Sequence, residues 1–116
     1  AQARAQVGAP LAVAGRPLSL FVETTDEKVM NMAVNLTVAP WGHLILCEDN
    51  YSSEIPNHLK GVTPEGKIYT LGRNVFRGNS EFCGACFDPA GKVLFVKVQS
   101  PGITFAIWGP WARGPL

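Results

Sequence analysis

Three carboxylates and one arginine are the side chains of this sequence best suited to bind metal ions or phosphate. Glu48 and Asp49 end an apolar run, and Glu81 follows a loop and precedes Phe82. Carboxylate oxygens at a strand end can coordinate hard cations such as calcium or ferric iron. Arg73 also ends a predicted strand, and its guanidinium can hold a phosphate through two hydrogen bonds. The residues alone leave alternatives open. Glu48 and Asp49 can form a solvated strand end, Glu81 can cap a turn, and Arg73 can be an exposed arginine without a ligand.

The cysteines are a second candidate group. Cys83 and Cys86 have the spacing of metal knuckles and redox motifs, but a zinc site needs two further ligands. Cys47, His43 and His58 do not occur in pairs with the close spacing of metal ligands. The three cysteines are an odd number, so they cannot all be joined in disulfides. We therefore interpret the cysteines as buried structural residues and the histidines as exposed residues beside turns.

The composition excludes several classes of protein. Only 16% of the 116 residues are charged and the net charge is +1, which argues against a nucleic-acid binder and a polybasic membrane-surface module. No apolar run reaches the roughly 18 residues that a membrane span needs. A hydrophobic fraction of 47% predicts a folded core. So few charges on so small a chain indicate that other protein covers part of its surface.

A short repeat organises the chain between these candidate residues. Each copy has an apolar residue, the pattern x-Pro-x-Gly, a polar residue and another apolar residue, and the copies are Val38–Leu44, Val62–Ile68 and Phe87–Val93. Proline presets φ for the first central position of a turn, and glycine accepts the left-handed conformation that follows. Because the flanking residues favour strands, each copy predicts a β-hairpin.

Joining the hairpins predicts an all-β fold made of propeller blades. A four-stranded antiparallel blade is expected from strands at Asn35–Pro40, His43–Glu48, His58–Thr63 and Lys67–Arg73. Parts of two neighbouring blades are expected at Pro17–Glu23 on one side, and at Gly84–Phe87, Lys92–Gln99 and Ile103–Trp108 on the other. Residues 1–16 are interpreted as a flexible or partner-bound arm, 17–111 as the partial propeller and 112–116 as a tail. Asp26–Met32 is the only helix-like stretch, of two turns at most.

Four segments of the chain, in the same order, resemble the PhoX-type alkaline phosphatases. They are Asn35–Asp49, Gly61–Tyr69 followed by Arg73-Asn74, Ser80–Phe82 followed by Gly84–Phe87, and Gln99–Trp111. The resemblance covers about residues 17–111. Two positions depart from the pattern, because Val34 stands where the family usually has an acidic residue and Cys83 where it usually has a small one.

The resemblance implies a fold, an activity and a metal centre. Members of the family are exported, monomeric β-propellers that hydrolyse phosphate monoesters with a cluster of iron and calcium ions in the centre of the propeller. The resemblance places the acidic pair Glu48-Asp49 near the metal centre and favours Glu48 as a ligand. Glu81 as a further metal ligand and Arg73 for phosphate are predicted from residue type and position. Calcium and iron are the implied cofactors, and the implied location is exported, periplasmic or extracellular.

One blade with parts of two others leaves two apolar faces open, so we expect other protein chains to cover them. Packing between blades is the predicted role of the large aromatic residues Trp41, Phe105, Trp108 and Trp111. We expect the chain alone to be catalytically inactive. The alternative function is a non-catalytic structural or interaction subunit of a larger exported or membrane-associated assembly.

Overall fold

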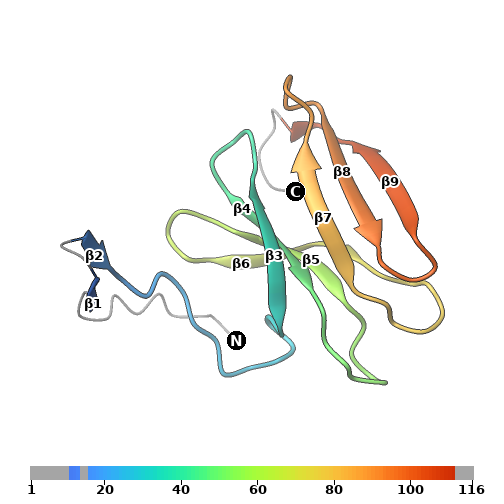
Figure 1. The fold of residues 1–116 in the computed structure, drawn as a ribbon, viewed down its shortest axis with the longest axis horizontal. Coiled ribbons are helices and arrows are strands. Elements are labelled where there is room, and N and C mark those ends of the chain that lie inside the picture. Colours follow the sequence, from blue (N-terminus) through green and yellow to red (C-terminus); the bar gives the residue numbers. More distant parts are fainter. Residues whose placement is uncertain (1–10, 14–15, 112–116) are drawn as a thin grey trace.

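The computed structural model describes residues 11–13 and 16–111, and nine β-strands lie among them (Figure 1). The strands are β1 (Leu11–Val13), β2 (Arg16–Leu18), β3 (Ala33–Val38), β4 (Leu44–Glu48), β5 (His58–Val62), β6 (Ile68–Arg73), β7 (Phe82–Phe87), β8 (Val93–Val98) and β9 (Ile103–Trp108). No helix in these described ranges is long and apolar enough to cross a membrane.

The strands form three antiparallel sheets. The first is the small hairpin β1-β2, the second has the order β3-β4-β5-β6, and the third has the order β7-β8-β9. Every neighbouring pair is also consecutive in the chain, so each sheet is a meander. The second sheet is the predicted four-stranded blade and the third holds the strands expected to start the next one. The predicted all-β fold class is therefore confirmed.

The three Pro-x-Gly triplets lie at hairpin tips, as predicted. In each turn the glycine N–H donates to the carbonyl of the residue before the proline, at 2.8 Å for Gly42 and 2.9 Å for both Gly66 and Gly91. All three glycines have positive φ, between 66° and 88°. Residues that carry a side chain rarely adopt a positive φ, and for this reason every copy of the repeat has glycine at this position of the turn.

The N-terminal prediction needs a correction. Of the strand expected at Pro17–Glu23, only Pro17 and Leu18 are in a strand, and β2 pairs with β1 instead of adding to a blade. Residues 19–23 have no strand beside them, so their backbone has no ladder to join. Part of the predicted arm, Leu11–Val13 and Arg16, belongs to the β1-β2 hairpin. The rest of that arm and the predicted tail, residues 112–116, lie outside the described residues.

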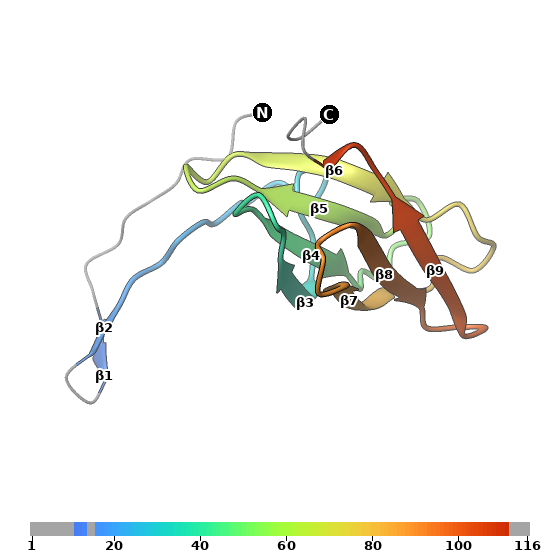
Figure 2. The ribbon, with the colours of Figure 1, turned by 90° about the horizontal axis from the view of Figure 1, so that it is seen from above.

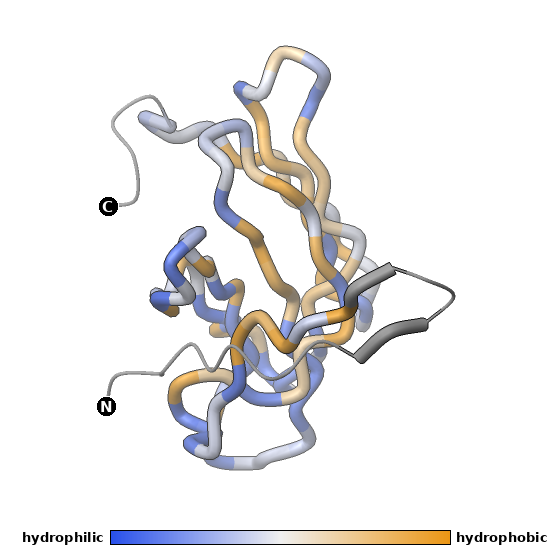
Figure 3. The backbone as a smooth tube through the Cα atoms, turned by 90° about the vertical axis from the view of Figure 1, so that its left-hand side faces the viewer, coloured by the Kyte–Doolittle hydropathy of each residue, from blue (hydrophilic) through white to orange (hydrophobic). Residues whose placement is uncertain are grey.

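A hydrophobic core joins the second and third sheets. β7 packs against β3 and β4, and Figure 2 shows the two sheets together, with the β1-β2 hairpin standing away from both. The buried core residues are Cys47, Leu59, Phe82, Ala85, Leu94, Val96 and Val98. The strands are mostly hydrophobic and the long loops mostly hydrophilic (Figure 3), and residues of both sheets contribute to the core.

Aromatic side chains close one end of this core. Trp41, at the first hairpin tip, stacks on Trp111 with ring centroids 5.3 Å apart, and both rings meet the edge of Phe87. These contacts join the two sheets, as expected of the tryptophans. Trp108 and Phe105 are exposed on β9, so their packing between blades stays a prediction.

Tyr69 packs across the middle of the four-stranded sheet. Tyr69 in β6 is the cross-strand partner of Gly61 in β5. A Cβ at Gly61 would lie 1.9 Å from Cζ of the Tyr69 ring, so the ring occupies the space that any other residue would need. Glycine at this position therefore allows an aromatic ring to lie flat on the neighbouring strand.

An edge strand of the four-stranded sheet presents a row of exposed apolar side chains. Val34, Leu36 and Val38 alternate along β3 and are 55%, 57% and 62% exposed. Because these side chains are exposed, this face of β3 is available to another chain.

Candidate metal site

Two long loops at one end of the four-stranded sheet build a pocket. The first, residues 49–57, joins β4 to β5, and the second, residues 74–81, joins β6 to β7. The tight Pro-x-Gly turns connect the strands at the opposite end of the sheet (Figure 1). The meander therefore brings both long loops to the same side.

Three asparagines fasten these loops to each other. Asn57 Oδ1 accepts hydrogen bonds from Asn50 N at 2.7 Å and Asn50 Nδ2 at 2.8 Å. Across the gap, Asn57 N donates to Asn79 Oδ1 at 2.7 Å, and Asn79 Nδ2 donates to the carbonyls of Ser52 and Ile55. Asn50 and Asn57 are buried, so this network fixes the loops in a water-poor environment.

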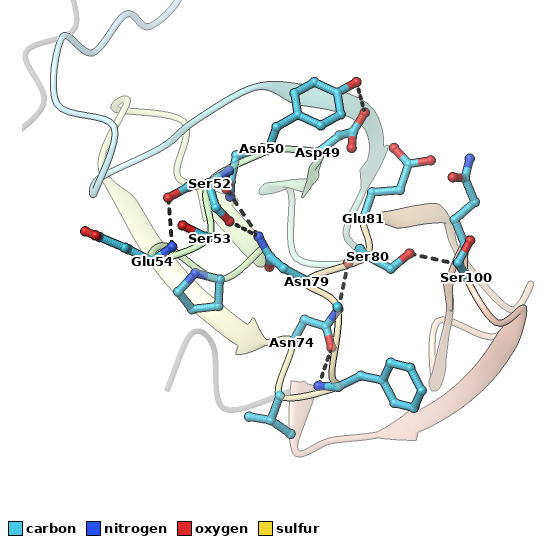
Figure 4. Close-up of a pocket in the computed structure, with 16 residues that line it drawn as sticks. Asp49, Asn50, Ser52, Ser53, Glu54, Asn74, Asn79, Ser80, Glu81 and Ser100 are labelled. Carbon is cyan, nitrogen blue, oxygen red and sulfur yellow. Dashed lines mark hydrogen bonds between the residues drawn. The ribbon is translucent and has the colours of Figure 1, made fainter.

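The pocket between the loops has a volume of about 780 Å³ (Figure 4). Ser80 belongs to its wall, where its carbonyl accepts a hydrogen bond from Asn74 Nδ2 and its Oγ accepts one from Ser100 N. The polar side chains of the lining are mostly amides, hydroxyls and carboxylates: Asp49, Asn50, Ser52, Ser53, Glu54, Asn74, Asn79, Ser80, Glu81, Gln99 and Ser100. The wall is therefore rich in oxygen atoms.

Asp49 and Glu81, two of the predicted ligands, meet in this pocket. One follows β4 and the other precedes β7, and both line the wall. Burial raises the pKa of Glu81, and a hydrogen bond and charge repulsion from Asp49 raise it further. The charge of Asp49 also raises the pKa of Tyr51, whose hydroxyl lies 3.4 Å from Asp49 Oδ2. Two carboxylates that repel each other in a shared space favour a cation between them.

Glu48, which the resemblance favoured as the metal ligand, lies outside the pocket. Its side chain is 1% exposed. Oε1 accepts a hydrogen bond from Asn31 N at 2.9 Å, and Oε2 accepts from His58 N at 3.0 Å and lies 2.9 Å from His58 Nδ1. Both carboxylate oxygens are thus engaged inside the protein, and the structure gives Glu48 a structural environment. His58, expected to be an exposed turn residue, is instead its partly buried partner.

Arg73 is also separated from the acidic pair. It ends β6 with an exposed side chain and lines a neighbouring apolar cleft together with Val75, Phe76 and Phe105. Asn74, Val75 and Phe76 line both cavities, so the two lie on opposite sides of this short segment. The role of Arg73 in binding phosphate stays a prediction.

The cysteines correct part of the prediction. Cys47 is buried, and burial raises its pKa to about 11, so its thiol stays protonated near neutral pH. Cys83 is partly buried, with a pKa raised by burial and by the charge of Glu81. Cys86 is exposed, because a bulge around Gly84 shifts the register of β7 and turns Cys86 outward. All three are free thiols.

The asparagine network is the part of the site that sequence reasoning missed. Asn50, Asn57 and Asn79 were not among the candidate residues of the sequence. Asn57 lies immediately before β5 and Asn79 shortly before β7, and no periodic hydrophobic pattern marks these positions. The one available signal is that asparagine is frequent in loops that bond their own backbone, and Asn79 does adopt positive φ.

The donor set fits part of a hard-cation site. Within residues 11–13 and 16–111, no three histidine, cysteine, aspartate or glutamate side chains come together as a metal cluster would require. Calcium takes about six to eight oxygen ligands, so the carboxylates of Asp49 and Glu81 can supply only part of such a shell.

The chain matches one known protein family. The family model described as alkaline phosphatase PhoX matches residues 2–102. No curated protein and no solved structure gives a significant match. The matched region includes both loops of the pocket and both carboxylates, Asp49 and Glu81. Since the match extends over most of the chain, this protein belongs to the PhoX alkaline phosphatase family.

Proposed function

We propose that this chain is a propeller module of a phosphate-monoester hydrolase and contributes Asp49 and Glu81 to its metal centre. The observation that carries the proposal is the convergence of these two carboxylates in an oxygen-lined pocket, in a chain that belongs to a phosphatase family. Family membership supports a metal-dependent phosphatase relationship. The two residues support a particular place for the metal.

Calcium suits this pair better than iron does, because the available donors are all hard oxygen atoms. When bound, such a metal polarises a phosphate oxygen and lowers the pKa of an attacking oxygen. The role of this chain is to position the cation. Asp49 is fixed by a hydrogen bond from its backbone N–H to the Met32 carbonyl, and Glu81 by the Gln99 N–H, which donates to its carbonyl. Two carboxylates on a backbone that is held in this way can position a cation.

Completion of the site requires further blades. The acidic pair supplies two side chains to a shell that needs several more oxygens. We therefore propose that the chain alone hydrolyses no phosphate monoester, and that the remaining ligands come from other propeller blades. Because members of this family are typically exported, we place the enzyme outside the cytoplasm, in the periplasm or the extracellular space.

The same apolar faces also favour a second candidate function, a structural subunit of a larger assembly. Under either function we expect another protein surface to cover the exposed apolar side chains of β3, which are Val34, Leu36 and Val38. The two candidates differ in the pocket, since a structural subunit has no need of a metal between Asp49 and Glu81.

Terbium luminescence tests the metal proposal directly. Terbium replaces calcium at oxygen sites and is excited through a nearby tyrosine, and Tyr51 contacts Asp49 here. We expect terbium to give a luminescence signal that calcium reverses, and we expect Asp49→Asn and Glu81→Gln each to lower terbium affinity at least tenfold. Glu54→Gln is the matched control, because Glu54 lines the same pocket without belonging to the pair. If both pair variants bind terbium as the unchanged chain does, the proposed site is wrong.

A further inference from the structure

An apolar cleft opens between the two large sheets, on the far side of the Asn74–Phe76 segment from the acidic pocket. It has a volume of about 390 Å³. Leu59 and Gly72 form its wall on the four-stranded sheet, and the opposite wall is formed by residues of the third sheet: Phe82, Val96, Val98, Phe105 and Ile107. Side chains from both sheets therefore enclose it as two apolar walls.

Arg73 provides the only charge in the lining of this cleft. Its side chain is exposed, and no carboxylate lies within ion-pair distance of it among the described residues. The two carboxylates of the neighbouring pocket belong to a different lining. A guanidinium at the mouth of an apolar cavity attracts an anionic head group, and its planar fork matches carboxylate and phosphate alike.

We propose that this cleft binds a single-chain amphipathic anion, with its apolar body between the sheets and its carboxylate or phosphate head on Arg73. The volume lies within the range of small-ligand sites and is small for a protein segment. Exposed Val75 and Phe76 line the cleft together with the arginine, so apolar side chains stand beside the charged group. The site requires neither Asp49 nor Glu81 and is independent of the proposed metal site.

Isothermal titration of the 116-residue chain with octyl phosphate, octanoate and octanol, each below its aggregation concentration, tests the proposal. Both anions should bind at least tenfold more tightly than octanol, and a preference between them identifies the natural head group. Each methylene removed from the chain should weaken binding about fourfold, because it takes apolar area out of the cleft.

Three variants separate the contributions. Arg73→Gln should weaken both anions about tenfold and leave octanol unchanged, since an exposed guanidinium contributes modestly. Arg77→Gln is the matched control, because Arg77 is an exposed arginine in the loop that follows Arg73 and lies outside the lining. Gly72→Leu should abolish binding of all three ligands by filling the cleft. A Cβ there meets only Leu59, at 3.7 Å, so we expect this variant to fold.

Several outcomes would overturn the proposal. Equal anion affinity in the Arg73→Gln variant would remove the head-group site, and retained binding by a folded Gly72→Leu chain would place the ligand elsewhere. Binding to vesicles of anionic phospholipid without binding of the monomeric anions would assign the loop to a membrane surface instead. The Asp49→Asn variant should bind octyl phosphate as the unchanged chain does, so this result is separable from failure of the metal site.

Discussion

Replacement of Glu48 by glutamine should destabilise the protein strongly and leave metal binding intact. The carboxylate of Glu48 connects Asn31, before β3, to His58, the first residue of β5. Glutamine keeps the size of the side chain and removes its charge. It also turns an acceptor into a donor, so that one side-chain N–H faces an N–H of Asn31 or His58 without a partner.

The magnitude follows from the burial of this group. A hydrogen bond to a charged group contributes about 1.5–3 kcal/mol, and a buried N–H left without a partner costs about 1–3 kcal/mol. The Glu48 side chain is 1% exposed and accepts several such bonds, so the figure of about 3 kcal/mol applies. The entropy of unfolding for 116 residues is roughly 0.24 kcal/mol/K, at about 2.1 cal/mol/K per residue. The melting temperature should therefore fall by about 12 °C.

Thermal melting followed by circular dichroism measures this effect, with Glu27→Gln as control. Glu27 is exposed and its side chain makes no hydrogen bond within the described residues, so its variant should melt within about 1 °C of the unchanged chain. The Glu48→Gln chain, below its melting temperature, should still bind terbium. A Glu48→Gln protein that melts normally but loses terbium would refute this reasoning and restore Glu48 as the metal ligand.

Three further predictions concern the pocket, the sheet and the exposed face. Because the folded pKa of Glu81 is raised, the folded state holds its proton more tightly, and stability should fall as pH rises through the unfolded value of 4.5 toward the folded one. Urea titrations should show that Glu81→Gln lacks this fall and gains stability relative to the unchanged chain near neutral pH. Gly61→Ala should cost about 1–3 kcal/mol by displacing the Tyr69 ring, and the double variant with Tyr69→Ala should show no additional loss from the alanine at 61. The chain alone should self-associate or bind a dye for apolar surface, and Leu36→Thr should reduce both; a monodisperse chain without dye binding would contradict this.

The hairpins could be predicted from the sequence because their determinants are local. A proline and a glycine two positions later fix the backbone of each turn, and the flanking apolar residues fix the strands. No distant contact is needed for either. The same logic fails at Pro17–Glu23, where the residues favour a strand but a strand exists only beside a partner.

The direction in which individual side chains point was harder to predict than the hairpins. Four consecutive residues of β4, including Cys47 and Glu48, are buried, because this central strand is covered on both faces. Alternation therefore could not show that Glu48 points inward and Asp49 into the pocket. In β7, Phe82 and Ala85 are both buried although three positions separate them, because the bulge at Gly84 changes which residues face the core. A strict two-residue period places Cys86 inside, and the structure places it outside.

The convergence of Asp49 and Glu81 was implicit in the repeat. Each Pro-x-Gly triplet reverses the chain at one end of a sheet, so the intervening connections must lie at the other end. A carboxylate directly after β4 and another directly before β7 therefore share that end, although 32 positions separate them (81 − 49). Gly91 fixes the relation of the two sheets at the opposite end, where its Cα approaches Pro40 so closely that a Cβ would lie 2.7 Å from the proline ring. The tips thus join the sheets through close packing, and the long loops at the other end remain free to carry polar chemistry.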